Sequence, residues 1–213
     1  MSYKYYGQFN PPVDKIIFER YFPNKTHGTC IEAGAYDGIT ESSTYFFEKN
    51  FNWTCFNIEP LPIVYDNLIK NRPHAKNFNI ALSNKNGEAT FINYKHPTLN
   101  YNWGNGSLSH SDKHKKMLEQ LCSEKQVMNV KCITYSTFIK QNNIQELDLF
   151  VLDVEGHELQ VIEGMYECDI LPNVFVIEHG YNPIGYFDSY LSNLKCKYKL
   201  DYTSFVNSFY IKC

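Results

Sequence analysis

The sequence contains no apolar run long enough to cross a bilayer. Its most apolar stretch, residues 147–154, is interrupted by Asp148 and Asp153, whereas a membrane-spanning helix needs about 20 consecutive apolar residues. The N-terminal residues are polar and rich in tyrosine and proline, which differs from the basic and then apolar order of a secretory signal peptide. These absences predict a cytoplasmic protein with no membrane span.

Lysine and arginine form no extended block, and charge of neither sign dominates. The 20 basic side chains are spread among 23 acidic ones, which gives a formal net charge of −3. Proteins that bind nucleic acid through its phosphates usually present a basic patch or stripe. We therefore expect no nucleic-acid partner.

Two further patterns are missing. The seven cysteines are irregularly spaced and include no Cys-x-x-C pair, so a zinc site or a disulfide framework is not expected. Cys30 and Cys55 lie within apolar, strand-like runs, where a free thiol behaves as a small hydrophobic side chain. The dinucleotide pattern Gly-x-Gly-x-x-Gly is also absent, which argues against a pyrophosphate-containing cofactor.

What is present is an alternation of short β-like and helix-like runs. It predicts an α/β fold, with a doubly wound parallel sheet and helices on both faces. A chain of 213 residues suits one domain with a full core, so we expect a single domain over 1–213. The expected strands are 29–35, 53–58, 77–82, 89–94, 127–133, 147–153, 173–178, 198–202 and 205–212. The expected helices are 13–22, 42–49, 63–71, 113–125, 137–141 and 157–165.

A glycine-rich turn, Glu32 to Gly38, follows the first predicted strand and reads EAGAYDG. Glycine there permits backbone conformations and close approach to a ligand that a side chain would block. The next predicted helix, with Ser42 or Ser43 as its cap, directs its free N–H groups toward the same place. Ligands of open α/β sheets bind at this edge, beyond the carboxyl ends of the strands. A purely structural turn is the alternative interpretation.

Glu59 ends the second predicted strand, 21 residues after Gly38. An acidic residue in this place can accept hydrogen bonds from both hydroxyls of a ribose. A carboxylate also suits a ligand that carries positive charge, such as a sulfonium. On its own Glu59 could equally be a solvated loop residue, but together with the glycine turn it is interpreted as a ribose ligand.

Acidic side chains also follow two later strands. Residues 152–158 read LDVEGHE, and Asp153 comes directly after an almost wholly apolar strand, where burial shifts pKa values and catalytic groups are found. The alternative is that Asp153 caps the next helix, and for Glu155 and Glu158 a site role and a solvated role are equally weighted. Glu178 and His179 end the following strand. These groups suggest either a divalent-metal site with oxygen ligands or a general base for an alcohol, Asp153 or His179; a structural histidine is the competing interpretation.

Taken together, these segments resemble the FkbM family of methyltransferases. The matching segments are 31–38, 57–62, 79–83 with 86–87, 152–158, 176–178 and the closing pair within 198–212. The resemblance implies a Rossmann-like fold with a seven-stranded, mostly parallel sheet whose last strand is antiparallel, and S-adenosyl-L-methionine as cofactor. Two departures are Glu32, where the family more often has aspartate, and Asp37. The residues expected to bind the cofactor are Glu32, Gly34, Ala35, Tyr36, Asp37, Gly38, Ser42, Glu59, Pro60, Ala81, Leu82, Ser83 and Asp153.

The resemblance further implies an O-methyltransferase that acts on a hydroxyl of a sugar or glycan. Asp153 and His179 are the expected catalytic residues. By analogy with other sugar O-methyltransferases, Asp153 and Glu178 are candidate ligands for Mg²⁺. Residues 1–26 are expected to form a helical cap, and 95–126 a loop-and-helix lid over the acceptor, with Tyr101 and Trp103 available to stack on a sugar ring.

Three alternatives remain open at this point. The acceptor could be a natural product instead of a glycan. It could also be a nucleic acid, although the balanced charge and the missing Asn/Asp-Pro-Pro-Tyr motif argue against that. Finally, the domain could keep the fold as a non-catalytic scaffold, because fold alone does not settle function.

Overall fold

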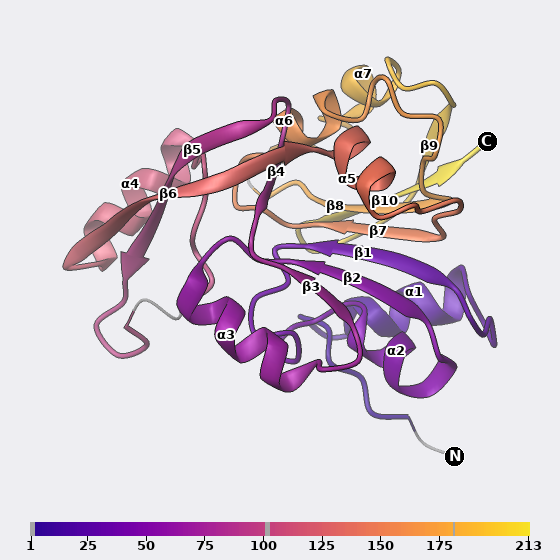
Figure 1. Ribbon diagram of the computed structural model, residues 1–213, viewed down its shortest axis with the longest axis horizontal. Coiled ribbons are helices and arrows are strands. Elements are labelled where there is room, and N and C mark those ends of the chain that lie inside the picture. Colours follow the sequence, from indigo (N-terminus) through magenta and orange to yellow (C-terminus); the bar gives the residue numbers. More distant parts are fainter. Residues whose placement is uncertain (1–2, 101–102, 181) are drawn as a thin grey trace.

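A seven-stranded sheet forms the centre of the computed structural model, which describes residues 3–100, 103–180 and 182–213. Its strand order is β3-β2-β1-β7-β8-β10-β9 (Figure 1). Neighbouring strands are parallel except that β10 runs antiparallel to β8 and β9. The predicted doubly wound α/β fold with an antiparallel last strand is therefore confirmed. The strands are β1 (Thr29–Ala33), β2 (Thr54–Ile58), β3 (Lys76–Phe78), β7 (Leu149–Leu152), β8 (Val174–Glu178), β9 (Tyr198–Ser204) and β10 (Asn207–Lys212).

Helices cover both faces of this sheet (Figure 1). Successive side chains of a strand point to opposite faces, and β7 follows this rule: Leu149 and Val151 pack in one apolar cluster, and Phe150 and Leu152 in the other. The first cluster holds residues of α1 and α2, and the second holds residues of α5, α6 and α7. The helices are α1 (Val13–Arg20), α2 (Tyr45–Phe51), α3 (Pro62–Asn71), α4 (Asp112–Leu121), α5 (Tyr135–Gln141), α6 (Glu158–Glu163) and α7 (Asp188–Leu191). None of these helices has the length and apolarity to span a membrane.

A second, three-stranded sheet lies beside the first and has the order β4-β6-β5 (Figure 1). Its strands are β4 (Ala81–Ser83), β5 (Gly87–Lys95) and β6 (Glu124–Thr134). The single strand predicted over 77–82 is therefore wrong, because β3 and β4 belong to different sheets. The chain leaves the first sheet at Asn79, whose side-chain amide donates to the carbonyl oxygens of Glu59 (2.9 Å) and Pro60 (3.0 Å).

The helix predicted over 113–125 also ends too late. Ser111 caps α4 by accepting a hydrogen bond from the backbone N–H of His114, and the helix ends before Cys122, which has an extended backbone. From Glu124 onward the chain pairs with β5 instead, because Glu124 lies opposite Lys95 in the antiparallel ladder. Tertiary pairing thus overrides the helical pattern of the last residues.

Candidate active site

The candidate site lies where the strand order of the large seven-stranded sheet reverses. From β1 the chain moves outward through β2 to β3, and it later returns to β7 on the other side of β1. Such a switch point opens a crevice beyond the carboxyl ends of the two central strands. A cavity of about 550 Å³ occupies this place, and its lining includes Gly34 after β1 and Asp153 after β7.

Gly34 allows these two strand ends to meet. Its φ is +86°, and a Cβ built on it would overlap the backbone carbonyl oxygen of Asp153. The backbone N–H of Asp153 donates to the carbonyl oxygen of Ala33 at 3.0 Å, which holds the two segments together. Only glycine combines this positive φ with so close an approach, so Gly34 is required by the backbone whatever the ligand.

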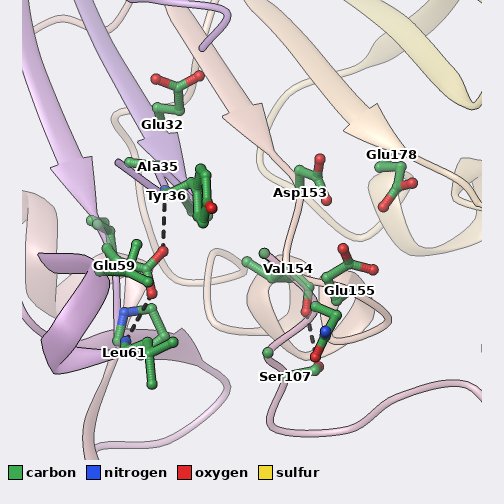
Figure 2. Close-up of a pocket in the computed structure, with 18 of the residues that line it drawn as sticks. Glu32, Ala35, Tyr36, Glu59, Leu61, Ser107, Asp153, Val154, Glu155 and Glu178 are labelled. Carbon is green, nitrogen blue, oxygen red and sulfur yellow. Dashed lines mark hydrogen bonds between the residues drawn. The ribbon is translucent and has the colours of Figure 1, made fainter. Parts of the chain in front are cut away.

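Glu59, at the end of β2, is a buried carboxylate fixed by the backbone. Its Oε2 accepts from the N–H of Tyr36 at 3.1 Å, and its Oε1 accepts from the N–H of Leu61 at 2.8 Å (Figure 2). Burial raises the pKa of Glu59 to about 7, although both backbone hydrogen bonds act in the opposite direction. Each carboxylate oxygen has a second lone pair, so Glu59 can still accept hydrogen bonds from a ligand in the cavity.

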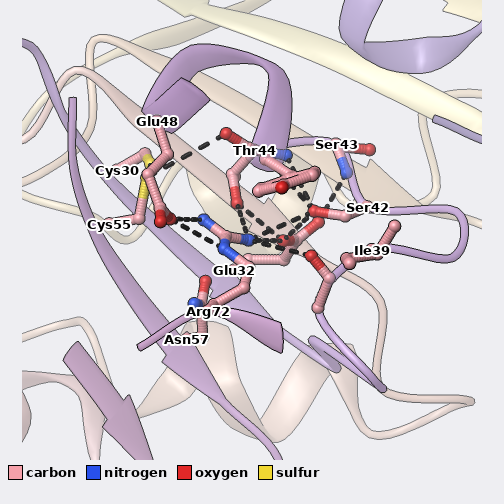
Figure 3. A network of polar contacts seen from close by, with 12 residues as sticks. Cys30, Glu32, Ile39, Ser42, Ser43, Thr44, Glu48, Cys55, Asn57 and Arg72 are labelled. Atoms are coloured by element: carbon pink, nitrogen blue, oxygen red, sulfur yellow. Dashed lines mark hydrogen bonds and ion pairs between the residues drawn. The ribbon is translucent and has the colours of Figure 1, made fainter. Parts of the chain in front are cut away.

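Glu32 belongs to a different network, behind the glycine turn (Figure 3). Its carboxylate accepts from the hydroxyls of Ser42 (2.8 Å) and Thr44 (2.7 Å) and from the backbone N–H of Ser43 (2.7 Å). Arg72, which is fully buried, lies 3.6 Å from the same carboxylate. Glu32 therefore joins β1 to the segment before α2, even though it also lines the cavity.

Arg72 is the centre of that network, and sequence reasoning did not single it out. Its Nε donates to Glu48 of α2 at 2.7 Å, and its Nη1 donates to the hydroxyls of Thr44 (3.1 Å) and Ser42 (3.3 Å). The guanidinium thus connects α3 to α2 and to Glu32. In the sequence Arg72 stands before a proline at a helix end, a pattern that predicts a boundary and gives no sign of burial.

Four further carboxylates line the cavity: Glu41, Asp153, Glu155 and Glu178. Asp153, Glu155 and Glu178 lie across from Glu59 (Figure 2), and Glu41 interacts electrostatically with Asp153 and Glu155. Asp153 and Glu178 end the neighbouring strands β7 and β8, as expected, and Glu155 lies just below them in Figure 2. Burial is the main cause that raises the pKa of each, and neighbouring negative charges raise the pKa of Glu41, Glu155 and Glu178 further.

His157 fixes the wall next to this acidic group. Its Nε2 is 3.0 Å from Oγ of Ser83 on β4, and its Nδ1 is 2.7 Å from Oγ of Ser109. Ser107 Oγ donates to the carbonyl oxygen of Val154 at 2.9 Å (Figure 2). The segment 103–109 is therefore bonded to the loop after β7. Its residues 103–108 form one wall of the cavity.

The remaining wall comes from a segment near the N-terminus and from the start of β10 near the C-terminus. Gln8 and Val13 line the cavity from the N-terminal segment, and Asn207 lines it from the start of β10. The rings of Phe9 and Phe205 stack at 4.5 Å and an interplanar angle of 11°, which joins the two segments. Asn207 carries no motif signal in the sequence, because its place beside Glu178 depends on the pairing of β8 with β10.

The structure brings most of the predicted site residues to this cavity and leaves four of them outside its lining. The lining contains Glu32, Gly34, Ala35, Tyr36, Ser42, Glu59, Pro60, Ala81, Leu82, Asp153 and Glu178. Asp37, Gly38, Ser83 and His179 do not line it.

Each of those four has another partner. Asp37 accepts from the backbone N–H groups of Ile39 (2.9 Å) and Thr40 (2.7 Å). A Cβ on Gly38 would meet the side chains of Leu68 and Arg72. Ser83 bonds to His157, and Nδ1 of buried His179 lies 3.0 Å from Oγ of Ser208 on β10. The expected role of His179 as a base therefore has no geometric support. Tyr101 lies outside the described residues.

The acidic group does not have the geometry of a metal centre. Within residues 3–100, 103–180 and 182–213, no three His, Cys, Asp or Glu side chains are placed to hold one ion. Asp153 and Glu178, the predicted Mg²⁺ ligands, have no third such side chain placed beside them among these residues. The residues present therefore do not fit the expected magnesium ion.

The chain is similar to known proteins in both sequence and fold. A family described as "Methyltransferase FkbM domain" matches residues 32–202. The fold is similar to that of methyltransferase FkbM from Methylobacillus flagellatus KT, with a TM-score of 0.52 and 12% identity. That comparison covers 87% of this chain and 43% of the other, so the chain spans less than half the length of this relative.

Two further solved structures are more distant. M. capricolum TrmK in complex with S-adenosyl-homocysteine has a TM-score of 0.45 and 8% identity, over 98% of this chain and 68% of that one. Precorrin-6y C5,15-methyltransferase from Geobacter metallireducens GS-15 has a TM-score of 0.44 and 8% identity, over 93% and 85%. No curated protein matches the sequence. Because the family match extends over most of the sequence, the chain belongs to the FkbM methyltransferase family.

Proposed function

We propose that the protein transfers a methyl group from S-adenosyl-L-methionine to a hydroxyl oxygen of a sugar or glycan, as a cytoplasmic enzyme. The observation that carries this proposal is Glu59. It is a buried carboxylate that two backbone N–H groups hold at the end of β2, on the lining of a cavity at the switch point of the sheet. Family membership supports the reaction class, and the hydroxyl acceptor goes beyond it.

The donor half of the cavity fits this cofactor. Glu59 would accept the ribose hydroxyls, Gly34 to Tyr36 would lie along the amino-acid end, and Ala81 and Leu82 offer an apolar surface for the adenine. When bound, the cofactor supplies a methyl group on a sulfonium, whose C–S bond breaks with its electron pair left on sulfur as the new O–C bond forms.

Asp153 is the proposed general base. It is the member of the acidic group that follows a central strand, and its backbone lies against Gly34 of the donor half. A hydroxyl becomes a good nucleophile when it loses its proton during attack. Asp153 accepts that proton, and burial, which raises its pKa, makes it a better acceptor than an exposed aspartate. The acceptor half would be closed by the lid 95–126 and the cap 1–26, with Trp103 against the acceptor; no magnesium ion is included.

The test is calorimetric titration with S-adenosyl-L-methionine at pH 8, where Glu59 is ionised, beside Glu59→Ala and Asp153→Asn. We expect micromolar binding that Glu59→Ala weakens at least about tenfold, since hydrogen bonds to a charged group contribute roughly 1.5–3 kcal/mol. Asp153→Asn should bind the cofactor nearly as well as the wild type and lose turnover on a panel of sugar acceptors. Glu146→Ala, an exposed change outside this cavity, is the control. Absence of binding in the wild type would contradict the proposal.

A further inference from the structure

Residues 155–157 form a docking loop, in which each residue contacts the segment that leads into and through α4. Glu155 Oε2 lies 3.2 Å from Nδ1 of His114. His157 Nδ1 lies 2.7 Å from Oγ of Ser109, and its other ring nitrogen faces the small sheet. These contacts join the lid to the loop that carries the proposed base.

Gly156 is the closest point of this contact. Its φ is +102°, and a Cβ built on it would lie 2.8 Å from the backbone oxygen of Ser109 and 2.9 Å from the backbone nitrogen of Ser111. Only glycine combines this positive φ with so close an approach. Gly156 does not itself line the cavity, so glycine is required here by the docked segment and not by a ligand.

The docked segment is fixed to the small sheet at both of its ends. Before it, Ser107 and Ile92 of β5 exchange two backbone hydrogen bonds of 2.9 and 3.0 Å. After it, Glu124 begins the pairing of β6 with β5. Within α4, all of which the structure describes, Leu118 alone is buried, and elements with few buried side chains open most readily. Residues 108–123 can therefore leave the docking loop without loss of sheet pairing.

Two side chains of this segment line the cavity, one in each half. Leu108 packs against the apolar cluster that contains Leu61 and Ala81, next to the proposed adenine position. His114 lies beside Glu155 of the acidic group. The docked segment therefore extends along both halves of the site, and a bound cofactor lies beneath it.

We propose that Gly156 and His157 are positioning residues that dock residues 108–123 over the cavity, and that this segment acts as a gate that undocks to let S-adenosyl-homocysteine leave. Closure of such a lid excludes water during transfer, and its opening often limits product release. The inference rests on the proposed function and deepens it, because it assigns control of cofactor exchange to the residues between Asp153 and Glu158.

The test is stopped-flow measurement of S-adenosyl-homocysteine association and dissociation with the wild type, Gly156→Ala and Ser109→Ala. A gate that undocks more readily should raise both rate constants, whereas loss of a ligand contact, as in Glu59→Ala, should raise dissociation alone. We expect dissociation to be about tenfold faster or more in Gly156→Ala, where a side chain blocks docking. The milder Ser109→Ala removes one hydrogen bond and should give an increase of about two- to tenfold.

Matched controls separate docking from general strain. Gly87→Ala also places alanine at a positive φ, +142°, but a Cβ there meets nothing within 4 Å. Ser123→Ala makes the serine change at an exposed position outside the cavity. Both should keep the wild-type rates. Hydrogen exchange of the Lys115 amide, which donates to the carbonyl oxygen of Ser111 at 2.8 Å, should be faster in Gly156→Ala and unchanged in Gly87→Ala.

The outcomes separate this inference from the proposed function. If S-adenosyl-homocysteine binds and both docking variants stay within twofold of the wild-type rates, the inference is overturned and the cofactor assignment stands. If dissociation alone becomes faster, these residues act as ligand contacts and the gate is overturned. If S-adenosyl-homocysteine does not bind the wild type, the proposed function and the gate are both overturned.

Discussion

Glu158, the first residue of α6, is a buried carboxylate that accepts hydrogen bonds from the backbone. Its Oε1 accepts from the N–H groups of Val154 (3.1 Å) and Gly156 (3.0 Å), and so it holds the loop that carries Asp153 and Glu155. Burial raises the pKa of Glu158 to about 7, from an ordinary value of 4.5. The folded protein therefore binds a proton here that the unfolded chain releases between about pH 4.5 and 7. Stability falls as pH rises through that window.

Glu158→Gln should consequently stabilise the protein at pH 8 and have little effect at pH 4.5. The amide keeps a carbonyl oxygen for the two backbone donors and removes the buried charge. We expect a gain of about 1–3 kcal/mol in the free energy of unfolding at pH 8, from the size of the shift. Urea denaturation at both pH values measures it. An equal effect at the two pH values, or a loss at pH 8, would contradict the ionisation argument.

At this scale the sequence predicts which strand ends carry chemistry better than it predicts which side chain faces the site. Glu59 could be singled out because an acidic residue ends the strand after a glycine turn. Glu178 and His179 are consecutive, and consecutive residues of a strand point to opposite sides. Only one of them can face the cavity, and the choice depends on neighbouring strands. In the structure Glu178 lines the cavity, and the His179 side chain contacts Ser208 instead.

Among the elements, α2 and α3 are held together by one buried cation. Arg72 is fully buried and bonds to Glu48 of α2 and to the hydroxyls that also bond Glu32. Removing one partner of a buried ion pair leaves the other charge uncompensated, which typically costs about 3–5 kcal/mol. The helix packing beneath the glycine turn therefore depends on this side chain.

We expect Arg72→Met to lower the free energy of unfolding by about 3–5 kcal/mol, measured by urea denaturation. Arg20→Met is the matched control, because Arg20 is exposed and pairs with Asp201 at the surface; a surface pair contributes about 0–1 kcal/mol. If the two variants are equally stable, the buried network does not support the fold as described.

Element boundaries show a similar limit of sequence reasoning. The large sheet was predictable because its central strands are short apolar runs separated by turn residues. The division of residues 77–82 between two sheets could not be predicted. The chain leaves the first sheet at Asn79, whose side chain bonds to carbonyl groups of Glu59 and Pro60, about 20 residues earlier in the sequence. The second sheet likewise depends on β6 pairing with both β4 and β5, and no local pattern encodes those partners.

In the whole molecule, a segment near the N-terminus and the β9–β10 hairpin near the C-terminus both line the cavity. Phe9 of the N-terminal segment stacks on Phe205 of the β9–β10 turn, although Phe205 is 60% exposed. Stacked aromatic pairs add roughly 0.5–1.5 kcal/mol beyond the area they bury. This contact holds the segment that carries Gln8 against the hairpin that carries Asn207.

Phe205→Ala should loosen the N-terminal segment without unfolding the sheet. Hydrogen exchange of the Val13 amide, which donates to the carbonyl oxygen of Gln8 at 3.2 Å, should become about two- to tenfold faster, given the energy of one aromatic pair. Val127→Ala, another exposed apolar side chain, is the control and should leave this exchange unchanged. Unaltered exchange in Phe205→Ala would show that the stacking does not hold the wall.

The position of His157 has a practical consequence for spectroscopy. One ring nitrogen faces Ser83 of the small sheet and the other faces Ser109 of the segment over the cavity. The ring stays neutral at physiological pH, so its tautomer is set by these two hydroxyls rather than by titration. The two ¹⁵N resonances of this imidazole would therefore record, in one residue, whether the small sheet and the covering segment keep their places as ligands enter and leave.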